Sequence, residues 1–444
     1  MPQSSLPAAA RRSLLAYNCF FPFVFLALLP SLLRRMLRRG GFRENFGQRF
    51  GRYHPATRAR FAQGRWWWIH SISVGETLVA LKLAQELHRR DPALRVAITV
   101  TTSTGFALAR AACADWIEVL YNPLDGRTIV HSALDLIRPE RLILIEGEAW
   151  PNLLAECRAR DIPVALVNAR LSPRSERRFL RTRYWIAPIF KLIDQIFVPE
   201  KADLQRWQGL GIPAARLHLT GSIKFDSATD APPARTAEFQ TLLAALSVPA
   251  DAPVLLAGST WAPEEKILAE TFLQLRREFP RLFLILVPRH IERTPEILRD
   301  LAPLGLRICR RSALPLATPA DCDALLVDTT GELREWYALA TIVFVGKSLP
   351  GVAEVGGQNP AEPAALGKPV IVGPHLENFA ALLDLLHAHR AARTIPDSSA
   401  LIPVIRDLLR NPAARAAMGE RGRSALASHR GATGRTVELL FPRV

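Results

Sequence analysis

The chain has 444 residues, which is long enough for two domains. Of these residues, 49% are hydrophobic and 22% are charged, a composition that excludes a disordered protein. Lys and Arg number 57 against 41 acidic residues, and the resulting formal charge of +16 favours anionic partners such as lipid headgroups or phosphorylated substrates. A nucleic-acid partner is not expected, because the sequence contains no zinc-finger spacing, no basic heptad region and no run of interleaved aromatic and basic residues.

An uncharged segment rich in Leu and Phe occupies residues 13–33, with two arginines before it and four within the six residues after it. A helix of about 20 residues is long enough to cross a bilayer. The heavier basic cluster on its C-terminal side places the rest of the chain in the cytoplasm. We therefore expect a single N-terminal membrane anchor within residues 1–40. Asn18, Pro22 and Pro30 leave open a helix that lies in the membrane interface instead.

The five cysteines are scattered, odd in number and never form a CxxC pair. This spacing predicts reduced thiols rather than a disulfide framework or a zinc site. The residues are Cys19, Cys113, Cys157, Cys309 and Cys322.

Apolar runs alternate with amphipathic segments along both halves of the chain, which is typical of parallel sheets covered by helices on both faces. The expected strands are 66–69, 96–101, 117–121, 142–145, 164–167 and 193–199, then 254–257, 283–287, 324–327, 342–345 and 370–372. The expected helices include 150–160, 177–189, 264–277, 332–340, 360–366 and 379–389. Residues 222–239 contain two adjacent prolines and no apolar periodicity, which predicts a linker. This pattern predicts two Rossmann-like α/β domains facing a central cleft, as in glycosyltransferases of the GT-B type.

Glu76 follows the first predicted strand and lies in the first turn of the predicted helix that begins near Thr77. One interpretation is an ordinary acidic residue that interacts with the helix dipole, worth about 0.3–1 kcal/mol. The other is a general base at the carboxyl end of a parallel strand, where open α/β sheets bind ligands. Residue type alone favours the first interpretation.

Two further clusters follow predicted strands in the first half. Residues 146–152 (EGEAWPN) place two acids and a Trp at a strand end, which favours a function over a plain surface turn. Residues 221–226 (GSIKFD) place Lys224 at the domain junction. A single lysine is usually a solvated charge, but in a cleft it can neutralise a phosphate or a carboxylate.

The second half has its own polar clusters at strand ends. Arg289, in VPRH, suits a phosphate oxygen, whereas His290 is expected to be structural. Residues 329–332 (TTGE) and 356–370 (GGQNPAEPAALGKPV) follow. Paired glycines before a helix bring backbone N–H groups close to an anion, and Glu362 could accept hydrogen bonds from a ribose. Residues 321–323 (DCD) match a D-x-D metal motif but precede a predicted strand, so we expect no metal there.

These clusters, in this order, resemble the 3-deoxy-D-manno-octulosonic acid (Kdo) transferases of lipopolysaccharide biosynthesis. The resemblance covers nearly the whole chain and extends to residues 101–105 (TTSTG), 168–172 (NARLS), 258–260 (GST) and 373–379 (GPHLENF). The sequence departs from the family pattern at residues 346–348 (GKS), at Gln358 and in the loosened motif EGEA at 146–149.

The resemblance implies an inverting, metal-independent transfer of Kdo from CMP-Kdo to a lipid A precursor (lipid IVA), without a cofactor, at the cytoplasmic face of the inner membrane. It implies that Glu76 is the proton acceptor and that Glu146 and Lys224 stabilise the transition state. The CMP-binding residues that it implies are Pro288, Arg289, Thr330, Gly331, Glu332, Asn359, Pro360, Ala361 and Glu362. It assigns residues 1–40 to the membrane anchor, 41–228 to an acceptor-binding domain, and 229–444 to a CMP-sugar-binding domain with C-terminal helices.

Two other functions stay open at this point. One is a membrane-associated GT-B glycosyltransferase that uses a different nucleotide sugar. The other is a membrane-anchored nucleotide-binding protein without activity. The presence of three candidate catalytic residues together argues against it: Glu76, Glu146 and Lys224.

Overall fold

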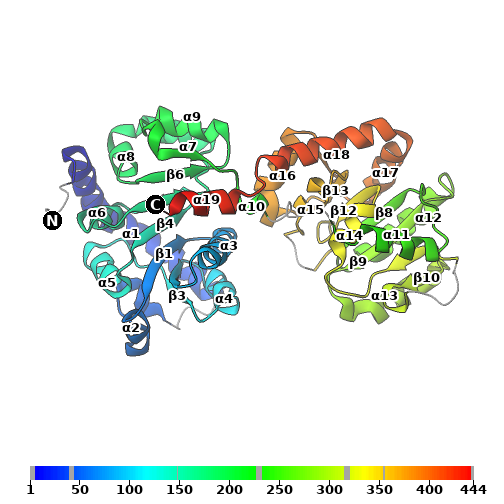
Figure 1. Cartoon of the computed structure of the whole chain (residues 1–444), viewed down its shortest axis with the longest axis horizontal. Helices are drawn as coiled ribbons and strands as arrows, with labels where there is room; N and C mark the ends of the chain where they lie inside the picture. Colours follow the sequence, from blue (N-terminus) through cyan, green and yellow to red (C-terminus); the bar gives the residue numbers. More distant parts are fainter. Residues whose placement is uncertain are drawn as a thin grey trace. The chain divides into compact units, whose positions relative to one another are not determined.

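The computed structural model describes residues 6–39, 45–147, 149–226, 233–314, 321–353 and 356–441. The chain forms two compact units, one of Met1–Lys224 together with Gly431–Val444 and one of Phe225–Arg430. Each unit is built on a parallel sheet of seven described strands (Figure 1). The expected α/β class with two doubly wound sheets is therefore confirmed.

In the first unit the strand order is β3-β2-β1-β4-β5-β6-β7. The strands are β1 Arg65–Ser71, β2 Leu94–Val100, β3 Ile117–Tyr121, β4 Arg141–Ile145, β5 Val164–Val167, β6 Gln195–Val198 and β7 Leu217–Leu219. The order reverses between β1 and β4, and in open α/β sheets ligands bind where this happens. Apart from Arg65, every residue of the central strand β1 is buried, as a strand covered on both faces requires.

Helices cover both faces of the first sheet. They are α1 Ala8–Arg39, α2 Pro55–Phe61, α3 Val74–Arg90, α4 Ser103–Ala111, α5 Arg127–Ile137, α6 Pro151–Ala159, α7 Pro173–Arg181, α8 Arg183–Phe190, α9 Lys201–Gly209 and α19 Ala432–Leu440, with α10 Ile223–Asp226 at the unit boundary. The single helix expected over 177–189 is wrong, because the chain breaks at Thr182 between α7 and α8.

In the second unit the order is β10-β11-β9-β8-β12-β13-β14. The strands are β8 Val254–Thr260, β9 Phe283–Pro288, β10 Ile308–Arg310, β11 Ala324–Leu326, β12 Ile342–Val345, β13 Val370–Val372 and β14 Ala392–Thr394. The helices are α11 Thr236–Ala245, α12 Glu264–Arg276, α13 Thr294–Leu301, α14 Leu333–Leu339, α15 Ala361–Ala365, α16 Ala380–Ala388, α17 Leu401–Arg410 and α18 Pro412–Ala427. The three-residue strands β7, β10 and β14 were not expected, because each contains polar residues and none forms an apolar run.

The last helix, α19, belongs to the first unit, although residues 229–444 were expected to form one domain. It packs against α3, and the ring centroids of Phe441 and Trp67 lie 5.0 Å apart. Arg435 donates from Nη2 to the carbonyl oxygen of Thr220 over 2.7 Å. Figure 1 shows α19 in red among the elements of the first unit.

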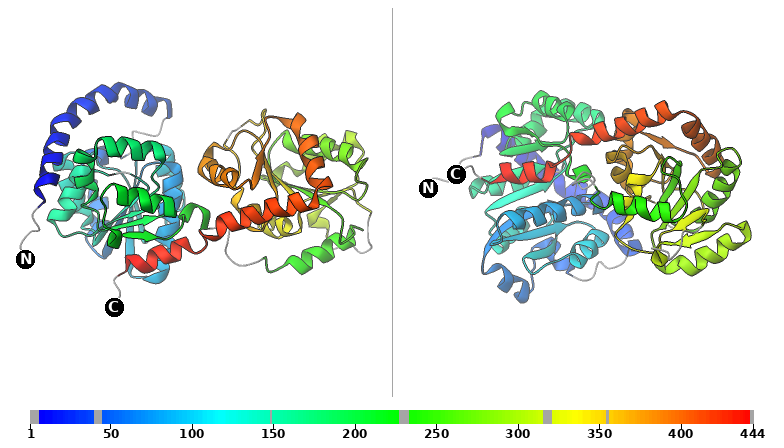
Figure 2. Two further views of the ribbon diagram at one scale, coloured as in Figure 1. Left: turned by 90° about the horizontal axis from the view of Figure 1, so that it is seen from above. Right: turned by 45° about the vertical axis from the view of Figure 1, so that its right-hand side comes forward.

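The uncharged N-terminal segment is helical, as expected, within α1. Figure 2 shows α1 curving around the outside of the first unit. Its first half packs on α8 and α6. Asn18, one of the residues that weighed against a spanning helix, exchanges hydrogen bonds of 2.8 and 3.0 Å with Asn152 of α6. Across the described residues, no helix combines the length and the apolar character that crossing a bilayer requires.

The prediction that all cysteines are reduced is wrong, because Cys309 and Cys322 form a disulfide. Cys309 lies in β10, and Cys322 lies two residues before the first residue of the neighbouring parallel strand β11, so their Cα atoms lie 6.2 Å apart. A separation of 13 residues in the sequence conceals this pairing. Cys19, Cys113 and Cys157 are free thiols.

Candidate active site

Glu76 lies in the first turn of α3, directly after the central strand β1. Ser73 caps this helix, since its Oγ accepts from the Glu76 backbone N–H (3.2 Å) and donates to Oε1 of the Glu76 carboxylate (3.0 Å). The backbone N–H of Ile72 donates to the other carboxylate oxygen over 2.8 Å. This is a capping box. It fixes the direction of the carboxylate at the carboxyl end of β1.

Glu146 and Lys224 form an ion pair. Glu146 follows β4, the other strand at the reversal of the sheet, and adopts a left-handed backbone conformation (φ 69°). A non-glycine residue in this region is strained, and such strain occurs mainly where the surrounding structure holds a residue for function. Both side chains are about 30% exposed, so the pair remains accessible to a ligand.

The loop before Glu76 lies beside Lys224. A methyl group added at Gly75 would lie 3.8 Å from Lys224 Nζ. The segment that carries Lys224 is held in place by Asn168, whose Oδ1 accepts from Ser222 Oγ and from the backbone N–H of Ile223. The first unit therefore brings together all three residues expected to be catalytic, at the carboxyl edge of its sheet.

Asp125 is a buried carboxylate near this edge that the sequence did not single out. It accepts hydrogen bonds from the backbone N–H groups of Asn152 (3.0 Å) and Leu153 (2.9 Å) at the start of α6. Burial raises the pKa of Asp125 to about 7, against the opposing effect of these hydrogen bonds. Asp125 belongs to no recognisable motif, so it could not be predicted as a site residue from the sequence.

We expect the Asp125 carboxyl to make stability depend on pH. Its pKa in the folded chain is above the ordinary 3.8, so the native state binds more protons than the unfolded state between about pH 4 and pH 7. The free energy of unfolding should therefore fall as the pH rises through this window. Urea unfolding at pH 5 and pH 7.5 measures the change, and Asp125→Asn should reduce it. An unchanged pH dependence in Asp125→Asn would contradict this prediction.

In the second unit, Pro288 ends β9 and Arg289 follows it. The backbone N–H of Arg289 donates to the Thr260 carbonyl oxygen at the end of β8 over 3.0 Å, which fixes the turn. The Arg289 side chain is exposed, and no carboxylate of the described residues lies within ion-pair distance of its guanidinium. His290 packs edge-on against Trp261, with ring centroids 5.0 Å apart, in agreement with a structural role.

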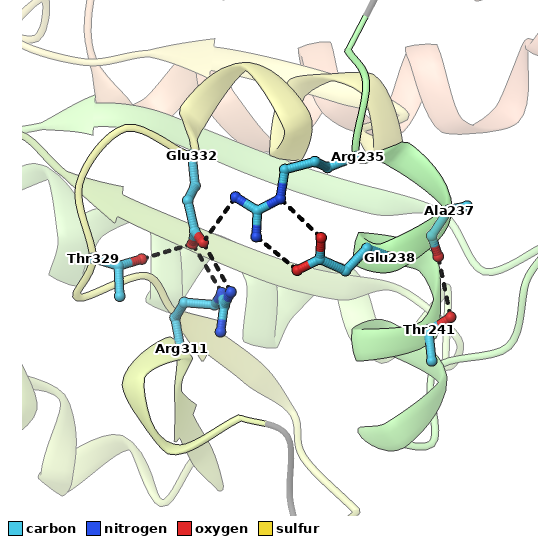
Figure 3. A network of polar contacts seen from close by, with 7 residues as sticks. All are labelled: Arg235, Ala237, Glu238, Thr241, Arg311, Thr329 and Glu332. Carbon is cyan, nitrogen blue, oxygen red and sulfur yellow. Dashed lines mark hydrogen bonds and ion pairs between the residues drawn. The ribbon is translucent and has the colours of Figure 1, made fainter.

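Glu332 is buried, and its carboxylate accepts hydrogen bonds from neighbouring side chains (Figure 3). Arg311 donates two hydrogen bonds of 2.8 Å to it, and Thr329 Oγ1 donates a third of 2.7 Å. Arg235 lies 3.8 Å away and is itself paired with Glu238. The expected CMP-binding turn thus exposes Thr330 and Gly331, while Glu332 points inward and holds Arg311. Arg311 belongs to no recognisable motif, so this pairing could not be predicted.

Replacing Arg311 with Met should lower the free energy of unfolding by about 3–5 kcal/mol, because it leaves the Glu332 carboxylate buried without its main partner. The turn at residues 329–332 should loosen, so KM for the donor should rise. Urea unfolding of the full chain and initial rates measure both effects. Arg299→Met is the control, since the exposed pair of Arg299 with Asp300 should contribute less than about 1 kcal/mol to the free energy of unfolding. Equal losses in the two variants would contradict the prediction.

The glycine-rich segment ends in the short helix α15. Asn359 Oδ1 accepts from the Ala361 backbone N–H (3.0 Å), Pro360 precedes the helix, and Glu362 lies in its first turn. Burial raises the pKa of the Glu362 carboxyl, and Arg334 opposes this. Gly357 has φ 71°, and a side chain there would meet Leu376 at 2.7 Å. This glycine is therefore required both by conformation and by close packing against the 373–379 segment.

A second buried carboxylate, Glu264 at the start of α12, was also missed. Its two oxygens accept from the backbone N–H groups of Trp261, Lys347, Ser348 and Leu349, at 2.7 to 3.1 Å. Burial raises the pKa of this carboxyl, and these four donors oppose the shift. Glu264 thereby joins the loop after β8 to the loop after β12, the two strands between which the order of this sheet reverses.

The D-x-D sequence at 321–323 is used for ion pairs. Asp323 pairs with Arg276 and Arg307, and Asp321 pairs with Arg307. Burial opposes ionisation of Asp323, but the arginine hydrogen bonds outweigh it and hold the pKa of this carboxyl below its ordinary value. Among the described residues no group of three or more His, Cys, Asp or Glu side chains is arranged to hold a metal ion.

Two doubly wound α/β units, each with polar motifs at the carboxyl ends of its strands, define a two-domain α/β enzyme. A family model of 3-deoxy-D-manno-octulosonic-acid transferase (kdotransferase) matches residues 44–227. The 3-deoxy-D-manno-octulosonic acid transferase of Haemophilus influenzae is 32% identical over 403 residues, 90% of this chain and 92% of that protein. The transferase of Bordetella pertussis is 36% identical over 421 residues, 92% of this chain and 94% of that protein. The chain therefore belongs to the 3-deoxy-D-manno-octulosonic acid transferase family and is a glycosyltransferase.

Among solved structures, the chain is similar to the C-terminal CMP-Kdo binding domain of WaaA from Acinetobacter baumannii, with 30% identity and a TM-score of 0.40 over 44% of this chain and 98% of that one. It is also similar to UDP-GlcNAc 2-epimerase from Neisseria meningitidis, with 14% identity and a TM-score of 0.46 over 84% of this chain and 99% of that one.

Proposed function

We propose that this enzyme transfers Kdo from CMP-Kdo to a hydroxyl group of the lipid A precursor lipid IVA, with inversion at the anomeric carbon. The observation that carries the proposal is the ion pair of Glu146 and Lys224 beside the loop of Glu76, in a chain of this family. A base and a cation in one place are what the transfer of an acidic sugar to an alcohol needs.

In the proposed reaction, Glu76 accepts the proton of the acceptor hydroxyl as its oxygen attacks the anomeric carbon of Kdo. The bond from that carbon to the CMP phosphate oxygen breaks, and CMP leaves with the bonding electron pair. Lys224, oriented by Glu146, stabilises the negative charge of the transition state. Arg289 and the turn of Thr330 and Gly331 hold the CMP group, with Glu332 acting through Arg311. Asn359, Pro360, Ala361 and Glu362 complete the proposed donor site.

We assign the acceptor to the first unit and the donor to the second. The proposal also places the enzyme at the cytoplasmic face of the inner membrane, with α1 as the element that attaches it. Leu15, Phe20 and Phe23 of α1 are 67 to 71% exposed, so this helix offers apolar side chains to a lipid surface. Basic residues near such a surface add about 1 kcal/mol each when the lipids are anionic.

Product analysis tests this function directly. Purified full-length enzyme is incubated with CMP-Kdo and lipid IVA in detergent micelles, and the product is measured by mass spectrometry. We expect an increase in mass by whole Kdo residues and release of CMP. No product with CMP-Kdo, together with transfer from a uridine or guanosine sugar, would overturn the proposal in favour of another GT-B glycosyltransferase.

A further inference from the structure

Helix α7 presents four arginines to one pocket of about 560 Å³ on the first unit. Arg174, Arg177, Arg178 and Arg181 line it, together with Ser175 and Thr182. Their spacing of three and four residues places them along one side of the helix. Like charges at these spacings repel one another, so this arrangement opposes the stability of the helix.

No carboxylate in the described part of the chain lies within ion-pair distance of these four guanidinium groups. The acid of the same helix, Glu176, turns instead to Arg206 of α9, at 3.4 Å. Elsewhere in the molecule exposed arginines do find acids, as Arg65 does with Glu140. Within the residues that the structure describes, the pocket is therefore a concentrated positive site without a paired acid, and planar guanidinium groups suit phosphate oxygens in particular.

A second pocket, of about 720 Å³ and mainly apolar, adjoins the first, because Arg178 lines both. It lies between α1, α8 and the loop after β4, and aromatic side chains provide much of its wall. They include Tyr17, Phe20, Phe21, Phe179, Trp185 and Phe190. Its volume falls within the range of about 300–1,000 Å³ that is usual for ligand sites.

The position of the apolar pocket connects it to the site described above. Gly147 and Ala149 line it, and Gly147 directly follows Glu146, the partner of Lys224. A ligand with an apolar part in this pocket and an anionic part among the arginines would reach the loop of the candidate catalytic pair. A simple membrane phospholipid has no need of a site at that loop, whereas the sugar acceptor does.

We propose that the two pockets form one acceptor site, in which the α7 arginines bind a phosphate group of the glycolipid acceptor and the aromatic pocket takes one of its acyl chains. This inference rests on the proposed function and deepens it. The phosphate fixes the orientation of the glycolipid, so its hydroxyl is presented to the carboxyl edge of the first sheet.

The double variant Arg177→Gln/Arg181→Gln tests the phosphate contact in the full-length enzyme. Transfer is measured in uncharged detergent micelles, with lipid IVA and with the same lipid after removal of its phosphates. We expect the unmodified enzyme to prefer the phosphorylated acceptor by at least about tenfold in kcat/KM, and the variant to lose most of this preference through a higher acceptor KM. KM for CMP-Kdo should stay the same.

Arg90→Gln/Arg110→Gln is the matched control, since it removes two exposed arginines from the same unit, outside both pockets. It should keep the preference. Equal loss of preference in the two double variants would assign the effect to bulk charge and overturn the proposal, as would a preference that survives in Arg177→Gln/Arg181→Gln.

Ala16→Phe, which fills part of the apolar pocket, tests the acyl contact. It should raise KM for lipid IVA at least about fivefold and leave KM for a fully deacylated acceptor unchanged. Equal changes for the two acceptors would overturn this part. If the unmodified enzyme transfers no Kdo to any acceptor, the proposed function itself fails; if it does and the variants behave like it, only the acceptor site fails.

Discussion

Replacing Glu76 with Gln is expected to lower kcat by about 10²–10⁴-fold, the range that a positioned general base contributes. The glutamine amide oxygen can still accept from the Ile72 N–H, so the start of α3 should keep its conformation. It cannot take a proton from the acceptor near neutral pH. Steady-state rates with saturating lipid IVA measure kcat, and calorimetry should find CMP binding unchanged. Near-normal kcat would remove Glu76 from the reaction.

The capping box makes a second variant necessary, because Glu76 also supports the helix. Ser73→Ala removes the Oγ that caps the Glu76 N–H and should cost about 1 kcal/mol of stability. Its kcat should fall far less than that of Glu76→Gln. If the two variants lost similar activity, the carboxylate would serve only the helix.

Lys224→Met should lower kcat by about 10²–10³-fold, the effect of removing one group that stabilises charge in a transition state. Lys224→Arg keeps the charge but changes its shape and should recover part of the rate. Both are measured at saturating CMP-Kdo and acceptor, with thermal unfolding to confirm that the variants are folded.

A double-mutant cycle with Glu146→Gln tests whether the pair acts as one unit. Residues that act together lose less in the double variant than the sum of the single losses. We therefore expect Glu146→Gln/Lys224→Met to be about as slow as Lys224→Met alone. Strictly additive losses would show that Glu146 does not act through Lys224.

The parallel sheets could be predicted from the sequence because buried strands in such sheets are continuous apolar runs, and β1, β4, β8 and β12 are of this kind. The short strands β7, β10 and β14 contain polar residues and leave no such run. The break at Thr182 was also hidden, since no Gly or Pro marks it in residues 177–186.

The positions of the site motifs at strand ends were predictable for a similar reason, because the carboxyl ends of parallel strands meet at one edge. The partners of the side chains were not. Arg311 reaches Glu332 from 21 residues away, and Glu264 reaches Lys347 from 83 residues away. Such contacts depend on strand order, which no local pattern encodes. The disulfide of Cys309 and Cys322 escaped notice for the same reason.

The return of α19 to the first unit affects how the protein is made. Val437 and Leu440 of α19 are almost fully buried in the core beside α3, so that core stays open until α19 has emerged from the ribosome. By then the whole of Phe225–Arg430 has already been synthesised and can fold as an insertion within an unfinished host. A chain truncated after Arg430 and released from the ribosome should thus carry a protease-resistant second unit and a first unit that is still readily digested.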